Sequence, residues 1–393
     1  MHKVSISNAS DPPGQHVRVR SGPAVRQANE PLVLGLDVGG TKLAAGVVGA
    51  DGTVLSNLTA ASHAYQGPEQ MISRHLELGR DAVIAAGVDW AAVEAVGIAC
   101  GGPLDPLAGI IQSPPSLPGW DEVPLVSIVS EALDRPTVVD NDATAGALAE
   151  WWYGVGRTRA VRHLVYLTIS TGIGGGLVLD GRVYRGAAWN AGELGHLTVD
   201  YLGRPCGCGR RGCLEAYASG TNIAARAIEA LAASAERSSL RDLDTVTARD
   251  VAEAAAAADP IAGRVWDETT AILGSAVANI LDVFNPELVV LGGGVTRAGD
   301  QLLEPVRKLG LAQAMHPAAR SADVVLAELG DRLGVVSAAA VAFERLLRDE
   351  VLPDARLPGE PAATGAPPTP RPARAARSRR AAAGAGSGRS EEP

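Results

Sequence analysis

The chain has 393 residues, of which 46% are hydrophobic and 20% charged, so it has enough apolar material for a sizeable core. Its net charge of −9 argues against a nucleic-acid-binding surface over the whole chain, and no apolar run approaches the ~18 residues of a membrane span. Four cysteines are too few for a disulfide scaffold, and no secretory signal is recognisable, so we expect a cytoplasmic protein.

Both ends of the chain lack the patterns of folded elements. Residues 1–30 show no helical or strand period, which predicts a flexible arm. Residues 353–393 are rich in Ala, Pro, Gly and Arg and have almost no large apolar side chain, which predicts a disordered tail. An electrostatic contact with a partner is the alternative role for the arginines of this tail.

Between these ends, short apolar runs alternate with helical patterns. Glycine-rich turns separate the first three runs, and helices and further strands follow. In this first part of the chain, the predicted strands are 32–37, 43–48, 54–58, 95–99 and 136–140, and the predicted helices are 69–86 and 144–153.

The opening layout then returns, because three further apolar runs follow one another through a Thr/Gly turn and an Asp-Gly turn. The predicted strands of this second part are 164–169, 174–179, 182–184 and 287–291, and the predicted helices are 222–236, 248–258, 262–281 and 333–348.

This internal repeat predicts an α/β protein of duplicated β-β-β-α-β-α units, arranged as two lobes around a central cleft. We place the small lobe at residues 31–150 and expect the helix 333–348 to join it. The large lobe is placed at 151–332 and carries the cysteine cluster described below.

The turn between the first two strands has the composition of a phosphate-binding loop. Gly39 and Gly40 let backbone N–H groups approach phosphate oxygens. Thr41 offers a hydroxyl and Lys42 a positive charge, while Asp37 could hold Mg²⁺ or its waters. A tight β-turn without a ligand is the alternative for this hairpin taken alone.

A second hairpin, residues 168–176, offers Thr171, Gly172 and further glycines for the same purpose, and its duplicated context favours phosphate binding. Gly292 and Gly293 follow a predicted strand and could let an adenine or ribose lie against the backbone, unless they only form a turn. The first hairpin has neither a Gly-Lys-Ser/Thr sequence nor a G-x-G-x-x-G fingerprint, which argues against a P-loop NTPase and an NAD-dependent dehydrogenase.

Asp142 is the candidate catalytic base. It follows the strand 136–140 and lies at or near the N-terminus of a helix. Sugar phosphorylation needs a carboxylate that accepts the hydroxyl proton, and a helix N-terminus keeps such a group ionised. The neighbouring Asn141 can hydrogen-bond a hydroxyl. Because Asp and Asn are also favoured helix caps, a purely structural role is the alternative.

Three of the four cysteines, Cys206, Cys208 and Cys213, form a cluster. Cys206 and Cys208 are too close in sequence for an unstrained disulfide, whereas clustered thiols suit Zn²⁺, which takes four tetrahedral ligands. His196 is the nearest fourth ligand, so we expect a structural zinc site. The isolated Cys100 is interpreted as a small buried apolar residue.

Two glutamates flank the predicted zinc site. Glu193 lies three residues before His196, and Glu215 lies two residues after Cys213. Zinc would fix the backbone that carries both side chains, and fixed carboxylates suit hydrogen bonds to several sugar hydroxyls. A solvated surface carboxylate is the alternative for each glutamate taken alone.

Together these motifs resemble the ROK family of bacterial sugar kinases and regulators, and in particular its zinc-containing glucokinase-like members. The resemblance covers about residues 31–348, and its most specific part is the spacing of His196, the three cysteines and Glu215. The other matching segments are LGLDVGGTK (34–42), SPPSLPGW (113–120), NDA (141–143), TISTGIGGG (168–176), AGELGH (191–196) and LGGGV (291–295).

The resemblance implies an actin-like, ribonuclease H-like fold that binds ATP and a hexose in its cleft, and a homodimer or homotetramer. It implies that Asp142 is the base and that His196 serves zinc and sugar through its two ring nitrogens. The implied hexose ligands are Asn141, Glu193, His196 and Glu215. The implied phosphate contacts are Asp37, Gly39, Gly40, Thr41, Thr171 and Gly172.

The chain departs from the family pattern at Gly101, Ser116 and Thr144, where the family often has Pro, Asn and Asn. Gly101 and Ser116 are expected near the sugar, together with Gly102, which we add to the substrate-binding residues. These departures bear on the identity of the hexose more than on the chemistry.

We therefore predict ATP-dependent phosphorylation of a hexose at its 6-hydroxyl, with glucose as the leading substrate. The alternatives are a kinase for an N-acetylhexosamine or another hexose, and a sugar-responsive transcription regulator. Only about 30 residues precede the first predicted strand, fewer than the helix-turn-helix segment of such regulators needs, and the presence of Asp142 also favours the kinase.

Overall fold

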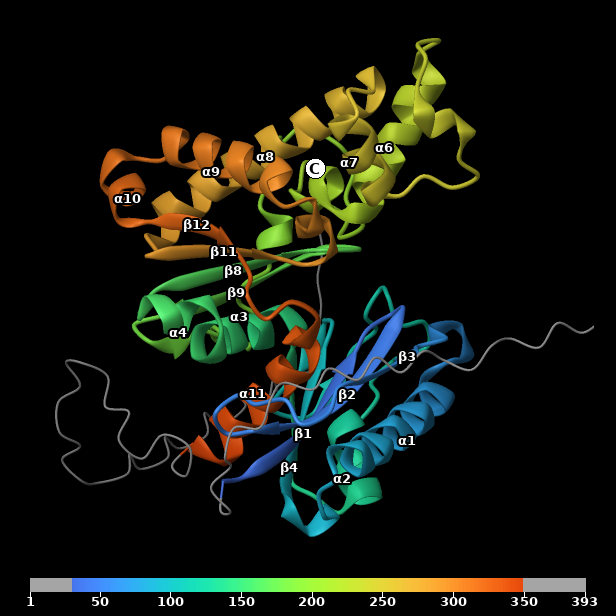
Figure 1. The fold of residues 1–393 in the computed structure, drawn as a ribbon, viewed down its shortest axis with the longest axis vertical. Helices are drawn as coiled ribbons and strands as arrows, with labels where there is room; N and C mark the ends of the chain where they lie inside the picture. Colours follow the sequence, from blue (N-terminus) through green and yellow to red (C-terminus); the bar gives the residue numbers. More distant parts are fainter. Residues whose placement is uncertain (1–29, 349–393) are drawn as a thin grey trace, which may run out of the picture. The chain divides into compact units, whose positions relative to one another are not determined.

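The computed structural model describes residues 30–348, which belong to one compact unit (Figure 1). The arm predicted for residues 1–30, except its last residue, and the tail predicted for 353–393 lie outside the described residues. Two five-stranded sheets and their helices make up most of the described chain.

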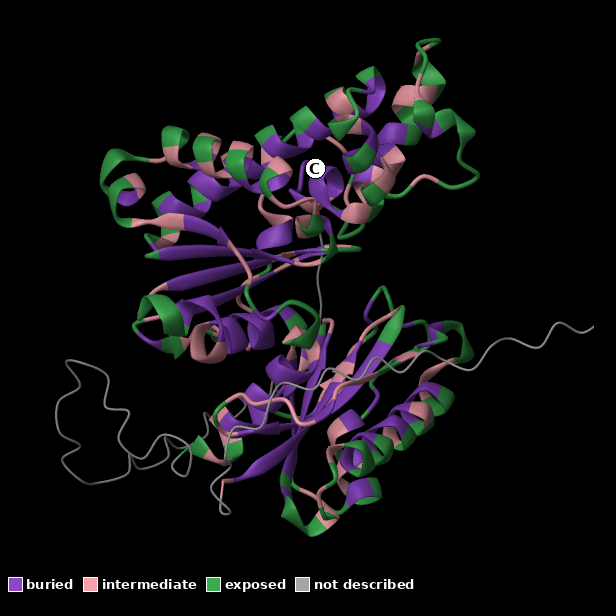
Figure 2. Ribbon diagram, viewed as in Figure 1, coloured by how far each residue is buried: buried purple, intermediate pink, exposed green. Residues whose placement is uncertain are grey.

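The first sheet is formed by the N-terminal part of the chain. Its strand order is β3 (Leu58–Ala61), β2 (Lys42–Gly49), β1 (Leu32–Val38), β4 (Val93–Cys100) and β7 (Thr137–Asn141). β4 and β7 run parallel to β1, whereas β2 is antiparallel to both of its neighbours. Each face carries its own apolar layer, because successive side chains of a strand point to opposite faces. Helices α1 (Pro68–Ala86) and α2 (Leu125–Leu133) cover one face, and α11 (Leu333–Leu346) covers the other (Figures 1 and 2).

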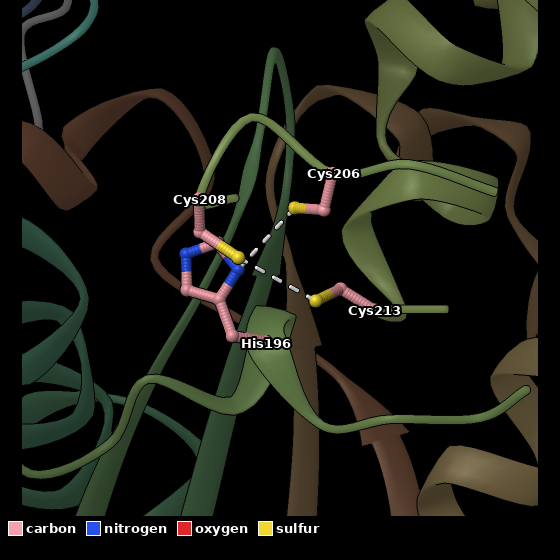
Figure 3. Close-up of side chains that lie close together, drawn as sticks. All are labelled: His196, Cys206, Cys208 and Cys213. Carbon is pink, nitrogen blue, oxygen red and sulfur yellow. Dashed lines mark hydrogen bonds between the residues drawn. The ribbon is translucent and has the colours of Figure 1, made fainter. Parts of the chain in front are cut away.

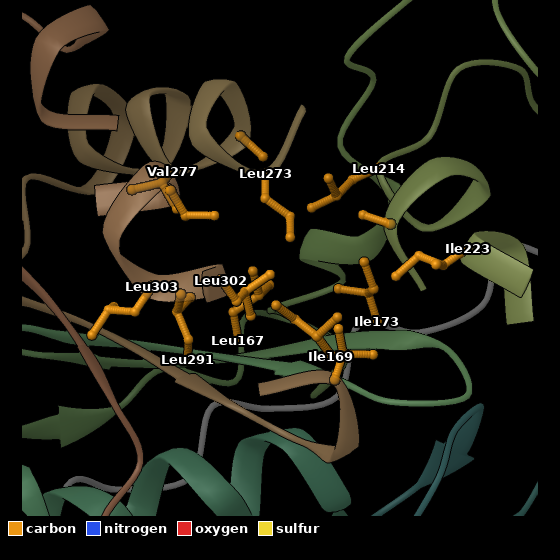
Figure 4. Close-up of a cluster of buried hydrophobic side chains, with 14 of the residues drawn as sticks. Leu167, Ile169, Ile173, Leu214, Ile223, Leu273, Val277, Leu291, Leu302 and Leu303 are labelled. Carbon is orange, nitrogen blue, oxygen red and sulfur yellow. The ribbon is translucent and has the colours of Figure 1, made fainter. Parts of the chain in front are cut away.

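The second sheet repeats this order with β10 (Arg182–Val183), β9 (Ile173–Leu179), β8 (Leu164–Ile169), β11 (Leu288–Gly292) and β12 (Asp323–Leu326). Helices α6 (Gly220–Ala233), α7 (Ala248–Ala256), α8 (Pro260–Phe284) and α9 (Asp300–Gln313) cover one face. Figure 4 shows part of this layer, where Leu167 and Leu291 of the strands lie below Leu273 of α8 and Leu302 of α9. The matching strand order confirms the duplicated α/β layout predicted from the sequence.

Short elements complete the described chain. They are β5 (Leu104–Asp105), β6 (Ile110–Ile111), α4 (Val155–Arg159), α5 (Glu215–Ala218), α10 (His316–Ser321) and the 3-10 turns η1 (Ala64–Gln66), η2 (Trp90–Ala92), η3 (Leu194–His196), η4 (Ser239–Asp242), η5 (Gly294–Ala298) and η6 (Gly330–Arg332). Within residues 30–348, no helix is both long and apolar enough to cross a membrane.

Helix α3 (Asp142–Tyr153) packs against both sheets. Its Ala145 and Leu148 belong to the apolar layer of the first sheet, whereas Ala147 belongs to a layer with Tyr166 of the second sheet. The approach to β9 is close, since a Cβ atom added to Gly176 would lie 2.6 Å from the Cβ of Ala147. Small residues on both elements therefore place the N-terminus of α3 between the two sheets.

Helix α11 approaches the first sheet equally closely. Gly35 of β1 and Gly97 of β4 are direct neighbours in the parallel ladder. A Cβ atom on Gly97 would overlap the carbonyl oxygen of Ala338, and one on Gly35 would overlap that of Val335. Because the two glycines lack side chains, the backbone of α11 can pack directly against the sheet at this point.

One predicted strand was wrong. The sequence predicts the third strand at 54–58, but β3 begins at Leu58, and Val54 makes only an isolated bridge with Val48. The cause is Ser56, whose hydroxyl oxygen accepts the N–H of Val47 at 3.0 Å in place of a strand carbonyl.

Helices α2 and α9 and strand β12 were not predicted, and α9 contains Pro305, which normally argues against a helix interior.

Replacement of Gly97 by Ala is expected to destabilise the protein by about 1–3 kcal/mol, because the added methyl group forces α11 away from the sheet. Denaturant or thermal unfolding would measure this loss. The matched control is Gly263→Ala in α8, where the added Cβ meets nothing within 4 Å and helix propensity favours alanine. Equal stability of the two variants would contradict the close packing of α11 against Gly97.

Candidate active site

Asp142 occupies the first position of α3, directly after the end of β7. The cap of this helix is Asn141, whose Oδ1 accepts the N–H groups of Ala143 at 3.0 Å and Thr144 at 3.2 Å. Asp142 Oδ1 accepts the N–H of Ala143 at 2.8 Å. Because Asn141 performs the capping, the structural alternative for Asp142 loses its main support. Part of the Asp142 residue is open to solvent, although protein atoms surround its carboxyl group closely enough to desolvate it.

Asp37, near the end of β1, and Asp142 are carboxyl groups whose charges repel each other. Desolvation by the surrounding protein raises the pKa of Asp37 to about 7, and the charge of Asp142 acts in the same direction, whereas Lys42 lowers the pKa. Desolvation also raises the pKa of Asp142, although the N–H of Ala143 lowers it. A cation beside this pair would offset the repulsion, so the carboxylate of Asp37 fits the predicted contact with Mg²⁺ or its waters.

Loops at the ends of β1 and β4 gather around Asp142. A Cβ atom on Gly101 would lie 3.9 Å from both Asp142 Oδ2 and Ser116 Oγ, so these two polar atoms border the same space. A Cβ atom on Gly102 would lie 3.4 Å from Asn141 Nδ2, and one on Gly40 would lie 2.8 Å from the Cβ of Ser116. Gly101 and Ser116, at which the chain departs from the ROK family pattern, therefore lie next to the candidate base.

The second glycine hairpin is held by residues that follow the cysteine cluster. Glu215 Oε2, on α5, accepts the N–H of Ile173 at 2.8 Å. A Cβ atom on Gly172 would lie 2.6 Å from the same Oε2. The hydroxyl of Thr221 donates to the carbonyl oxygen of Thr171 at 3.0 Å. These contacts fix the hairpin and make Glu215 a direct neighbour of the residues expected to bind phosphate.

Glu193 interacts electrostatically with Asp142, and its neighbour His196 belongs to the cysteine cluster. Desolvation raises the pKa of Glu193, His196 lowers it, and the charges of Asp142 and Glu215 raise it. His196 Nε2 lies 4.0 Å from Glu193 Oε2, whereas His196 Nδ1 lies 3.7 Å from Cys206 Sγ. The two ring nitrogens of His196 thus have different neighbours, and its dual role towards zinc and sugar stays a prediction.

The cysteine cluster has the geometry of a metal site (Figure 3). One ligand atom from each of His196, Cys206, Cys208 and Cys213 lies within 4.8 Å of all the others. Cys208 Sγ and Cys213 Sγ are 3.6 Å apart, and a tetrahedral zinc with Zn–S bonds of about 2.3 Å separates two sulfurs by about 3.8 Å. The donor set therefore fits Zn²⁺, while Cys100 is buried in the apolar layer of the first sheet, as predicted.

Two glycines that the sequence predicts to contact the nucleotide have a role in the packing of the protein itself. Gly292 pairs with Thr168 in the sheet, and a Cβ atom there would overlap the hydroxyl of Tyr166. Gly293 has a φ of 91° and lies against the carbonyl of Ile169. A nucleotide contact for the two glycines stays a prediction. Thr41, Lys42 and Thr171 are exposed at their hairpins, where a ligand can reach them, and the N–H of Gly39 donates to the carbonyl oxygen of Lys42 at 3.1 Å.

Sequence reasoning missed two charged residues beside this site. Asp140, next to Asn141, is fully buried and accepts a hydrogen bond from Nε of Arg185 at 2.7 Å. A carboxylate at the end of an otherwise apolar strand indicates that a buried partner exists. The sequence does not say which of the many arginines it is.

Comparisons with known proteins agree with this geometry. The family model described as ROK family matches residues 33–345. The glucokinase of Thermotoga maritima is 34% identical over 325 residues, covering 80% of this chain and 98% of the relative. The N-acetylmannosamine kinase of an Escherichia coli strain is also 34% identical, covering 79% of this chain and 97% of the relative. A ROK family glucokinase from Streptomyces griseus, solved with glucose and AMPPNP, is 33% identical with a TM-score of 0.69, covering 80% of this chain and 99% of that one.

Replacement of Glu215 by Ala is expected to loosen the second hairpin, because the N–H of Ile173 loses its carboxylate acceptor. A charge-assisted hydrogen bond of about 1.5–3 kcal/mol predicts roughly 10- to 100-fold faster exchange of this amide. Hydrogen exchange resolved at Ile173 would measure it. Glu215→Gln keeps an acceptor oxygen and should show a smaller change, and an unchanged amide in Glu215→Ala would show that the contact does not hold the hairpin.

Proposed function

Because the chain belongs to the ROK family, we propose that it is an ATP-dependent sugar kinase that transfers the γ-phosphoryl group to the 6-hydroxyl of a hexose, with glucose as the leading substrate. The observation that carries the proposal is the carboxylate of Asp142 at a helix N-terminus, with Glu193 close enough for the charges of Asp142 and Glu193 to interact. An N-acetylhexosamine is the alternative substrate class, supported by the similarity to an N-acetylmannosamine kinase.

Asp142 is proposed to accept the proton of the sugar hydroxyl as that oxygen attacks the γ-phosphorus. Desolvation shifts the pKa of Asp142 upward, towards the value of an efficient base at neutral pH. The helix N-terminus and the N–H of Ala143 favour the ionised form that the base needs before reaction. Oδ2 is the oxygen assigned to the proton, because Oδ1 already accepts the N–H of Ala143.

The sugar ligands we propose come from both lobes. Asn141 and Gly102 lie beside the base, and Glu193, His196 and Glu215 belong to the opposite side. Because Oε2 of Glu215 accepts the N–H of Ile173, its Oε1 is the atom available to a sugar hydroxyl.

Two hairpins are proposed to bind the phosphates of ATP, one through Gly39, Gly40, Thr41 and Lys42 and the other through Thr171 and Gly172. Asp37 would hold Mg²⁺ or its waters, and the ion would neutralise charge on the phosphoryl oxygens. Gly292 and Gly293 are proposed to lie along the nucleoside.

Zinc at His196, Cys206, Cys208 and Cys213 is proposed to be structural. Four protein ligands leave no open position for a reacting water or sugar oxygen. The ion would anchor the backbone between Glu193 and Glu215, so its effect on the sugar site is indirect.

The direct test is ADP release from Mg-ATP with glucose, mannose, fructose, allose, N-acetylglucosamine or N-acetylmannosamine. Turnover is expected on one of these sugars, and Asp142→Asn should lower kcat by about 10²- to 10⁴-fold because the amide cannot accept the proton. Sugar affinity should change little, since the amide keeps the size of the side chain.

Two outcomes would contradict this account. Undiminished turnover in Asp142→Asn would remove Asp142 from the chemistry. No turnover on any sugar by folded wild-type protein would favour a sugar-binding regulator, which DNA-binding measurements would then test.

Elemental analysis of purified protein should find about one zinc ion per chain, bound by the four clustered residues. Cys206→Ser should lose the metal and lower thermal stability. Cys100→Ala is the matched control, because it removes a cysteine that lies outside the cluster and should keep the full zinc content. Full zinc content in Cys206→Ser, or loss of zinc in Cys100→Ala, would refute the assignment.

A further inference from the structure

We propose that Arg185 is a positioning residue that acts through Asp140 to hold the strand end bearing Asn141 and Asp142 in register with the loop that leads to Glu193. This inference rests on the proposed function, because it assigns the two halves of the sugar site to these residues. It adds a residue that belongs to none of the motifs singled out in the sequence.

The first contact joins Arg185 to the base strand. The Asp140 side chain is 1% exposed, and both of its oxygens accept hydrogen bonds. Oδ1 accepts the backbone N–H of Asn141 at 2.8 Å, and Oδ2 accepts Nε of Arg185 at 2.7 Å. Any shift of the Asp140 carboxylate therefore disturbs the peptide unit between Asp140 and Asn141, which lies one peptide unit before Asp142.

A second set of contacts immobilises the guanidinium of Arg185. Its two terminal nitrogens donate to Glu344 of α11, at 3.1 Å to Oε1 and 2.5 Å to Oε2. The guanidinium also lies over the ring of Trp189, 5.0 Å from the ring centroid. Arg345 lies over the same ring at 5.1 Å and donates to the carbonyl oxygen of Val139 at 2.9 Å. The planar fork of Arg185 is thus held by Asp140 of β7, by Glu344 of α11 and by the ring of Trp189 in its own loop.

The backbone of Arg185 connects this cluster to the sugar loop. The carbonyl oxygen of Arg185 accepts the N–H of Ala191 at 3.0 Å, which closes the loop two residues before Glu193. Trp189 within this loop has a φ of 58°, a strained value for a bulky residue, and its ring contacts both guanidinium groups. The same arginine thereby reaches Asp140 with its side chain and the segment carrying Glu193 with its backbone.

The charges show why the guanidinium itself is required. Asp140 and Glu344 both lie against Arg185, whose side chain is only 10% exposed, and each accepts a different part of the same planar group. Lysine preserves the positive charge but has no rigid fork, so it cannot hold both carboxylates in this geometry. Arg185→Lys is therefore a gentler test than removal of the charge, which would leave the buried carboxylate of Asp140 and the half-buried one of Glu344 without their cation.

The matched control is Arg135→Lys at the other end of the same strand. Arg135 also lies over an indole ring, that of Trp90 at 5.4 Å, and donates to the carbonyl oxygens of Val93 and Trp90 at 2.6 and 3.0 Å. It precedes β7, whereas Asp140 lies near the carboxyl end of β7. Both substitutions replace the planar guanidinium of an arginine stacked on an indole ring. Only Arg185 contacts the end of β7 that precedes the candidate base Asp142.

Steady-state kinetics at a temperature where all variants are folded separate positioning from stability. Arg185→Lys should lower kcat/KM for the sugar about 10-fold or more, with kcat reduced and sugar KM raised, while KM for ATP stays within about twofold of wild type. Arg135→Lys should keep the wild-type kinetic constants. Asp140→Asn should reproduce the defect, and the double variant should add little to it, because both residues act through one contact.

Hydrogen exchange at the Asn141 amide provides a readout that needs no turnover. If wild type phosphorylates no sugar, the proposed function fails, but faster exchange of this amide in Arg185→Lys than in Arg135→Lys still supports the positioning role. Equal exchange of this amide in both variants would overturn it. Wild-type kinetic constants in an active Arg185→Lys enzyme, despite lowered thermal stability, would also overturn it and assign the cluster to stability alone.

Discussion

The close contact between α3 and β9 is the constraint on which the rest of the site depends. Helix α3 starts with Asp142 and shares its small side chains between the two sheets, so the candidate base lies between these sheets. The approach is possible because β9 presents glycines: a Cβ atom on Gly174 would lie 2.9 Å from the Cβ of Ala143, and one on Gly176 would lie 2.6 Å from that of Ala147. Larger residues on α3 or β9 would move the base away from the second sheet.

A second chain of contacts links the predicted zinc site to the nucleotide side. Cys213 is followed within two residues by Glu215, and Glu215 accepts the N–H of Ile173 beside Gly172. The same carboxylate is also the proposed sugar ligand. A single short segment thus connects the cysteine cluster, the proposed sugar ligand and the second hairpin, so a metal bound at the cluster would influence the geometry of the proposed site without taking part in the chemistry.

Most features that could be predicted from the sequence are encoded by residues close together in the chain. The spacing of His196 and the cysteines, the step from strand to helix at Asn141 and Asp142, and the repeated hairpins are all encoded by neighbouring residues. The features that were not predicted depend on contacts between residues that are distant in the chain. The bond from Val47 to Ser56 delays β3, and the pairing of Arg185 with Asp140 and Glu344 spans 45 and 159 residues. The glycines of β9 look like phosphate ligands in the sequence, although two of them serve the packing of α3.

The central claim is that one hexose hydroxyl faces Asp142 while ATP phosphates lie at the two hairpins. A crystal structure of this protein with glucose and a non-hydrolysable ATP analogue tests it most directly. The account predicts the 6-hydroxyl within about 2.6–3.2 Å of Asp142 Oδ2, with the γ-phosphate beyond it in line for transfer. A sugar bound elsewhere, or with a different hydroxyl at Asp142, would contradict the account.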